Sequence, residues 1–213
     1  MLFRSRDLER VRPVGTGHVA EELERVHGPD ATDGHLPADP RSTSVEPVAA
    51  TELPNPSLDV TLTPLAGESR PMREWLTTFH LASFVLDPYT NESSWILPVA
   101  ARIMRQFSGA AVRVNFIIAC GPDDARTFLG PLADEFLVYC DPDRAAIKAL
   151  GLSELPAFVV VQSNGTIPAA AQGWNATDWK HVAAKVADLT SWSKPSLPAP
   201  GDPGAFRGTP ALV

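Results

Sequence analysis

Two cysteines, Cys120 and Cys140, are the residues of this chain best suited to covalent chemistry. Each follows an apolar segment whose composition predicts a buried strand. If these strands are parallel neighbours in register, the two Cα atoms lie within the range that a disulfide spans. The pair could then exchange disulfides, and either thiol, if exposed, could act as a redox sensor. The alternative is that both are small buried apolar residues, which is the most common role of a free cysteine.

Other groups of reactive side chains are weaker candidates. Three histidines of the N-terminal part lack the cysteine or carboxylate pattern of a zinc site: His18, His27 and His35. The acidic residues near positions 123 and 141 stand at the expected starts of helices, where carboxylates favour the helix dipole, and they do not form a calcium-binding loop. We therefore expect no metal site and no cofactor.

Composition excludes several classes of protein. The chain has 213 residues, of which 44% are hydrophobic and 20% charged, as in an ordinary globular protein. Its net charge of −7 argues against binding of nucleic acid or of an anionic membrane by bulk electrostatics. No apolar stretch has the length of a secretory signal or a membrane helix, so we expect a cytoplasmic protein with reduced thiols. Arginine in excess over lysine is typical of a GC-rich bacterial genome.

The 21 prolines divide the chain into three parts. They recur through residues 1–56, where we expect a disordered segment with a possible short amphipathic helix at 17–27. This segment is either a solvated tail or a docking segment that folds on a partner. Prolines and glycines recur again in residues 193–213, where we expect a disordered tail. The folded domain should span residues 57–192.

Within residues 57–192 the hydrophobic pattern alternates between the period of a strand and that of a helix. Strands are predicted at 58–65, 80–86, 112–119, 135–140, 157–162 and 166–172. Helices are predicted at 94–107, after Gly121, at 143–150 and after Asn175 or Thr177. Strands separated by helices predict an α/β fold in which a mixed central sheet, with parallel middle strands, is flanked by helices.

Three short segments have the order and spacing of landmarks of a known fold. Phe84 to Tyr89 (FVLDPY) is an apolar strand that ends in a loop, and Pro98 lies inside the next helix, an expensive position for proline. Leu155-Pro156 precedes a β-branched strand that ends in the turn Asn164-Gly165. With these landmarks, residues 57–190 resemble the thioredoxin-like superfamily, in particular its branch of peroxiredoxins and thioredoxin-like thiol-disulfide reductases. The resemblance implies a thioredoxin-like three-layer fold and a cis peptide bond before Pro156.

The chain departs from this family at the residues that perform its chemistry. Counted back from Pro98 by the family's spacing, the two redox cysteines fall at Thr90 and Ser93, so that the segment is Thr90-Asn91-Glu92-Ser93. Disulfide exchange needs a thiolate at the helix start and a second thiol to resolve the mixed disulfide. A hydroxyl has too high a pKa and forms no disulfide. We therefore expect no catalytic residue in this loop, either for disulfide exchange or for peroxide reduction.

The same edge of the fold remains a candidate for peptide binding. By resemblance, the cis-proline loop and its neighbours would hold an extended peptide through strand-like pairing. The candidate binding residues are Tyr89, Trp95, Leu155, Pro156 and Trp174. Aromatic residues are common anchors at interfaces, although Trp95 and Trp174 could equally be core residues of the helix and the hairpin.

These observations favour a redox-inactive thioredoxin-like protein that acts as a protein-interaction, assembly or chaperone-type accessory factor through its cis-proline groove. A protein partner is then expected, and no nucleic acid or membrane. The alternative is an atypical thiol-disulfide oxidoreductase or redox sensor that uses Cys120 and Cys140. A third possibility is that the proline-rich tails perform the function and the folded domain serves as a scaffold.

Overall fold

The computed structural model describes residues 53–212, and the predicted helix at 17–27 lies outside them. Six helices are present in this range: α1 (Met72–Trp75), α2 (Asn91–Gln106), α3 (Pro122–Leu129), α4 (Leu132–Glu135), α5 (Ala145–Ala149) and α6 (Ala176–Thr190). The strands are β1 (Thr61–Pro64), β2 (Arg70–Pro71), β3 (His80–Leu86), β4 (Val112–Ile118), β5 (Leu137–Cys140), β6 (Glu154–Leu155), β7 (Ala157–Val161), β8 (Ala169–Gln172) and β9 (Thr209–Pro210).

Seven of these strands form one mixed sheet in the order β2-β1-β5-β4-β3-β7-β8. The middle strands β3, β4 and β5 are parallel, because α2 joins the first pair and α3 with α4 joins the second. The strands β1 and β7 pair antiparallel with β5 and β3, and β8 returns from β7 as a hairpin. Strands β6 and β9 form a separate two-stranded sheet. The mixed α/β sheet predicted from the sequence is confirmed.

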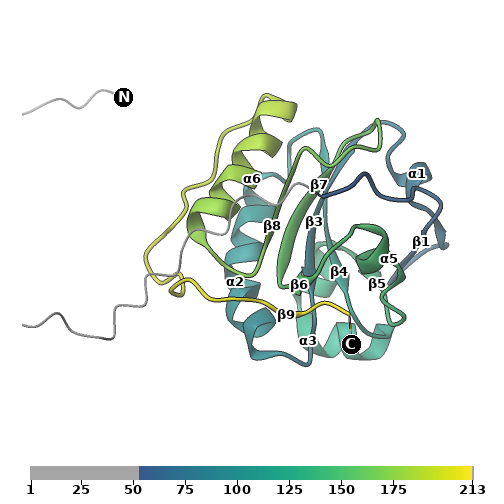
Figure 1. Ribbon diagram of the computed structural model, residues 1–213, viewed down its shortest axis with the longest axis horizontal. Coiled ribbons are helices and arrows are strands. Elements are labelled where there is room, and N and C mark those ends of the chain that lie inside the picture. Colours follow the sequence, from purple (N-terminus) through teal and green to yellow (C-terminus); the bar gives the residue numbers. More distant parts are fainter. Residues whose placement is uncertain (1–52, 213) are drawn as a thin grey trace, which may run out of the picture. The chain divides into compact units, whose positions relative to one another are not determined.

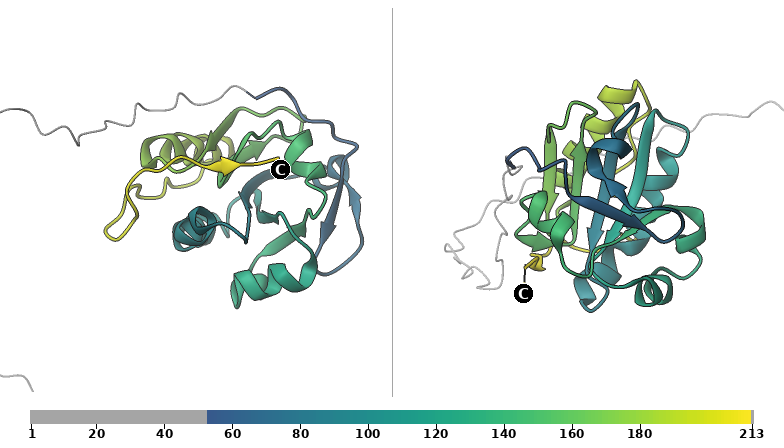
Figure 2. Two further views of the ribbon diagram at one scale, coloured as in Figure 1. Left: turned by 60° about the horizontal axis from the view of Figure 1, so that its bottom comes forward. Right: turned by 90° about the vertical axis from the view of Figure 1, so that its right-hand side faces the viewer.

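Helices cover both faces of the sheet (Figures 1 and 2). On one face α2, α3 and α6 pack against apolar side chains of β3, β4, β7 and β8. At the centre of this layer the rings of Phe84 and Phe158 stack 4.2 Å apart, and Trp179 of α6 packs against both. On the other face α1 and α5 cover a second set of buried residues. The domain therefore has three layers, as predicted.

The predicted and observed elements agree best where an element is long. The strand predicted at 80–86 is observed with these bounds, and the others shift by a few residues at their ends. Asn175 is the residue that caps α6, since its side chain accepts a hydrogen bond from the Thr177 amide. The short elements α1, α4, β2, β6 and β9 were not predicted because so short a segment has no measurable period.

The C-terminal segment corrects the prediction of a disordered tail at 193–213. From the end of α6 the chain runs back beside the helices and then crosses the lower edge of the sheet (Figure 1). Along this path Leu197 and Ala211 are buried, and residues 209–210 form β9. Prolines and glycines prevented a helix or a long strand, but they did not prevent the segment from packing against the domain. Composition alone does not report such tertiary contacts.

Candidate functional site

Four loops meet at one edge of the sheet and form the candidate site. Three of them follow the carboxyl ends of the parallel strands β3, β4 and β5, which lie at the same edge. The fourth contains Pro156, which precedes β7 and is brought beside the end of β3 by the pairing of Val85 with Ala157. The Leu155–Pro156 peptide bond is cis. Loops at this edge are the usual place for ligands in α/β sheets.

The loop between β3 and α2 contains a hydroxyl pair where the resemblance implies thiols. The Ser93 hydroxyl oxygen is buried and accepts a hydrogen bond of 2.9 Å from the Asp87 amide. The Thr90 hydroxyl donates to the Asp87 carbonyl oxygen at 3.0 Å and lies 3.0 Å from the Ser93 hydroxyl. These two side chains therefore hold the loop against the start of α2. They provide no group that could form or break a disulfide.

A buried ion pair between Asp87 of this loop and Arg144 holds the loop in place. The Asp87 carboxylate accepts a bond of 2.7 Å from the Arg144 guanidinium, and both side chains are largely shielded from solvent. Arg144 also donates to the Ala211 carbonyl oxygen at 2.8 Å. The sequence analysis missed this pair, because the two residues are 57 positions apart and each stands in a loop. One arginine thus links the helix-start loop to the C-terminal segment.

Tyr89, a predicted binding residue, projects from the edge. Its side chain is exposed, and its hydroxyl donates a 2.6 Å hydrogen bond to the Asp124 carboxylate at the start of α3. This hydrogen bond stabilises the protonated phenol and raises the pKa of Tyr89 to about 12. The hydrogen bond to Asp124 therefore restrains the orientation of the exposed Tyr89 ring.

The two cysteines lie near this edge but are not disulfide-bonded. Cys140 stands opposite Ile118 in the β4–β5 ladder, so Cys120 lies two residues beyond the register position that would face it. They are 3% and 8% exposed. Burial, with the nearby Cys140 and two carboxylates as smaller causes, raises the pKa of Cys120 to about 12. Burial also raises the pKa of Cys140, although Arg126 opposes this. Reactive cysteines have the opposite property, a lowered pKa and an exposed thiol.

The cis-proline loop is paired with the C-terminal segment of the same chain. Leu155 in β6 stands opposite Thr209 in β9, and the two strands are antiparallel. Outside this ladder, Trp174, which follows β8, forms an isolated bridge with Phe206 through two backbone hydrogen bonds of 2.9 Å each. The edge that the resemblance implies for a bound peptide therefore accepts a strand. Phe206 and its neighbours were not predicted to take part, because they stand in the segment expected to be a flexible tail.

The two tryptophans at this edge have different environments. Trp174 is 1% exposed and packs edge-on against Trp179 in the core, while its indole nitrogen donates to the Pro203 carbonyl oxygen at 2.8 Å. Trp95 on α2 is 54% exposed, and its ring meets the ring of Phe206 edge-on at 5.6 Å. Trp174 is thus a core residue that also contacts the C-terminal segment, whereas Trp95 is a surface residue that contacts it.

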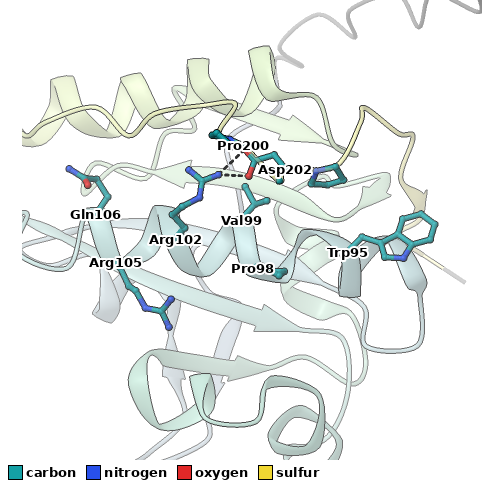
Figure 3. Close-up of a pocket in the computed structure, with 10 residues that line it drawn as sticks. Trp95, Pro98, Val99, Arg102, Arg105, Gln106, Pro200 and Asp202 are labelled. Carbon is teal, nitrogen blue, oxygen red and sulfur yellow. Dashed lines mark hydrogen bonds and ion pairs between the residues drawn. The ribbon is translucent and has the colours of Figure 1, made fainter.

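A cavity of about 580 Å³ lies between α2 and the C-terminal segment (Figure 3). Arg102 reaches across it and forms two hydrogen bonds, of 2.6 and 2.7 Å, with the Asp202 carboxylate. Trp95, Pro98 and Gln106 also line this cavity. Within the described part of the chain, no group of three or more histidine, cysteine or acidic side chains is arranged to hold a metal ion.

The sheet order, the helices on both faces and the cis-proline edge together define a thioredoxin-like fold. A thiol:disulfide interchange protein DsbE from Chlorobium tepidum superposes with a TM-score of 0.55 at 15% identity, over 67% of this chain and 99% of that one. Peroxiredoxin Q from Xanthomonas campestris gives 0.52 at 16% identity, over 66% and 95%. A secreted Mycobacterium tuberculosis disulfide oxidoreductase gives 0.50 at 19% identity, over 62% and 97%.

These structures confirm the predicted thioredoxin-like fold, and the proteins themselves are thiol-disulfide oxidoreductases and a peroxiredoxin. No protein-family model and no curated protein matches the chain. One of the similar structures is of a secreted protein, so the cytoplasmic location stays a prediction. None of the helices in residues 53–212 is long and apolar enough to cross a bilayer.

Proposed function

We propose that the domain is a redox-inactive thioredoxin-like module that binds an extended segment of a protein, as an interaction, assembly or chaperone-type accessory factor. The binding site is the cis-proline edge, with Leu155 and Pro156 at its centre and Tyr89, Trp95 and Trp174 around it. The observation that supports this most directly is the antiparallel pairing of Leu155 with Thr209 of the same chain, because a partner segment would bind through the same kind of strand pairing.

The loss of thiol chemistry rests on the side chains at the start of α2. Thr90 and Ser93 occupy the positions that the resemblance assigns to the redox cysteines, and their hydroxyls are used in hydrogen bonds that hold the loop. The remaining thiols, Cys120 and Cys140, have raised pKa values because they are buried. At neutral pH both are protonated and poor nucleophiles.

A second candidate is an atypical thiol-disulfide oxidoreductase or redox sensor that uses Cys120 and Cys140. Three observations favour it. The similar structures are of thiol redox proteins, and Cys140 ends β5 while Cys120 follows the end of the adjacent parallel strand β4 at the edge where the loops meet. Cys140 also lines a cavity of about 410 Å³, which would give a small oxidant access. This candidate requires a thiolate that the burial of both side chains disfavours.

A turnover experiment separates the two candidates. The full chain is assayed for reduction of insulin disulfides and of hydrogen peroxide, with dithiothreitol as the reductant, beside the matched Cys120→Ser/Cys140→Ser variant. The redox-inactive proposal expects both proteins to show the uncatalysed rate of dithiothreitol alone. Turnover above that rate by the full chain that disappears in the double variant would refute the proposal and establish a thiol-disulfide oxidoreductase that uses these cysteines.

A further inference from the structure

The occupant of the cis-proline edge is part of the same chain. Residues 197–212, here called the strap, come after the short segment that follows α6 and run across the site (Figure 1). The strap is fixed at its start by buried Leu197 and by the Asp202 carboxylate, which binds Arg102 (Figure 3). It is fixed at its end by Ala211, whose side chain is buried and whose amide donates to the Ser153 carbonyl oxygen at 2.8 Å.

Residues 206–211 of the strap make the contacts that a peptide ligand would make. The Phe206 ring packs against Trp95, and its backbone pairs with Trp174. The Thr209 hydroxyl donates to the Leu155 carbonyl oxygen at 3.3 Å. These contacts use an aromatic side chain, a hydroxyl and the backbone, which is the usual mixture of anchor and strand pairing in peptide recognition.

Close approach of two glycines limits which segment can fit. A Cβ atom on Gly208 would lie 2.8 Å from the Leu155 carbonyl oxygen and 2.8 Å from the Glu154 Cβ, closer than real Cβ atoms come. Gly173 is the second glycine. A Cβ atom on it would lie 2.8 Å from the Gly208 amide nitrogen, and its φ is +68°. The edge therefore accepts a strand only if that strand has glycine at the position of Gly208.

The strap can leave without disrupting the main sheet. Strands β6 and β9 form their own two-stranded sheet, so none of the seven strands of the central sheet loses a neighbour when β9 departs. Of the residues in the paired part, Arg207 and Pro210 are exposed, and Phe206 and Thr209 are only partly buried. Between residues 206 and 210 the strap is held mainly by backbone pairing, which a second strand of the same chemistry would reproduce.

We propose that the strap is an intramolecular ligand of the cis-proline edge, and that a protein partner binds by displacing it with an extended segment of the same pattern. That pattern is an aromatic residue, any residue, glycine, threonine, any residue and a small residue, as in Phe206 to Ala211. This inference rests on the proposed function of the edge and names its ligand class and its regulation. Arg144, which contacts both Asp87 and the Ala211 carbonyl oxygen, links occupancy of the edge to the helix-start loop.

The test uses the full chain with one substitution in the strap. Gly208→Leu introduces a side chain that meets the Leu155 backbone, whereas the matched control Gly204→Leu is in open space. We expect trypsin to cleave after Arg207 at least about tenfold faster in Gly208→Leu than in the wild type or in the control, because a released segment is accessible. Circular dichroism establishes that each variant is folded.

The second measurement is binding of a fluorescein-labelled peptide with the sequence of residues 203–213, followed by anisotropy. The tethered strap competes at an effective concentration on the order of mM, so the wild type and the Gly204→Leu control should not bind the peptide at micromolar concentration. Gly208→Leu should bind it, and should bind a peptide with Phe206→Ala at least about tenfold more weakly, because aromatic anchors dominate such interfaces.

Three results would overturn the inference. Equal cleavage after Arg207 in all three proteins would mean that the strap does not occupy the edge. Release of the strap in Gly208→Leu without peptide binding would mean that the strap is not a ligand. A wild-type dimer that exchanges straps between copies, detected by analytical ultracentrifugation, would replace the intramolecular ligand with a second copy.

If Gly208→Leu fails to fold, the Phe206→Ala variant of the full chain takes its place in both measurements. Redox turnover in the insulin assay would refute the proposed function whatever the peptide does, so the two failures are distinguishable.

Discussion

Alkylation of Cys120 in the native protein tests the electrostatic argument on which the redox-inactive proposal depends. Only the thiolate reacts, so the rate follows its population. An unperturbed thiol with a pKa of about 8.5 is about one quarter thiolate at pH 8. With its pKa raised to about 12, the Cys120 thiol is ionised in only about one molecule in ten thousand. Burial thus predicts labelling about two thousand times slower than that of a free thiol.

The assay uses iodoacetamide, with the extent of labelling read by intact mass on the folded chain and on the chain unfolded in urea. A Cys140→Ala variant reports the labelling of Cys120 alone. Because burial is the largest cause of the raised pKa of Cys120, removal of the Cys140 thiol should change the labelling rate little. The logarithm of the rate should rise by one unit per pH unit from pH 8 to beyond pH 10. The unfolded control should instead level off near pH 9.

A plateau of the native rate below pH 9.5, or native labelling within about tenfold of the unfolded control, would refute this reasoning. Either result would mean that the Cys120 thiol is accessible and has an ordinary or lowered pKa. The second candidate function would then have the nucleophile that it needs.

The same raised pKa has a consequence for stability. The unfolded thiol loses its proton first, so each buried thiol lowers the free energy of unfolding by about 1.4 kcal/mol per pH unit between pH 8.5 and the folded pKa.

Three further predictions concern the loop and the helices. The Thr90→Cys/Ser93→Cys variant should form a reversible disulfide, detected by intact mass, and the thiol nearer the helix start should have a lowered pKa; two thiols with ordinary titration would contradict this. Arg144→Met leaves the Asp87 carboxylate buried without its partner and should lower the free energy of unfolding in urea by about 3 to 5 kcal/mol, with partial recovery when Asp87→Asn is added. Asn175→Ala removes the cap of α6 and should cost about 1 kcal/mol in the same measurement, and no change would mean that the cap is not stabilising.

Local patterns predicted the central part of the fold. Strand β7 is apolar and buried throughout, and β3 and β4 each end in a buried apolar run, so local sequence identified all three without any knowledge of their neighbours. Pro98 within a helix and Leu155-Pro156 before a strand could be interpreted from the local sequence, because proline restricts its own backbone. The alternation of strands and helices then allowed few topologies.

The candidate site was predicted only in part, because its contacts join segments far apart in the chain. Leu155, Pro156 and Trp174 were identified from their local sequence and lie at one edge. Arg144 and the strap were missed, since an arginine in a loop and a segment rich in proline and glycine have no local pattern that names a partner. The sequence likewise could not predict that Cys120 is offset by two residues from the position opposite Cys140, because the pairing of β4 with β5 fixes this offset.

The sequence by itself determined the order of strands and helices, the hydroxyl residues Thr90 and Ser93 at the start of α2, and the proline before β7, because each depends on residues that are close in the chain. The tertiary structure decided what occupies that loop. Whether the C-terminal segment is free or bound depends on steric fit between Gly208 and the Leu155 backbone and on the pairing of Arg102 with Asp202, and both join residues more than fifty positions apart. Chain order sets no distance between such residues, so only the folded arrangement could show that the site is filled.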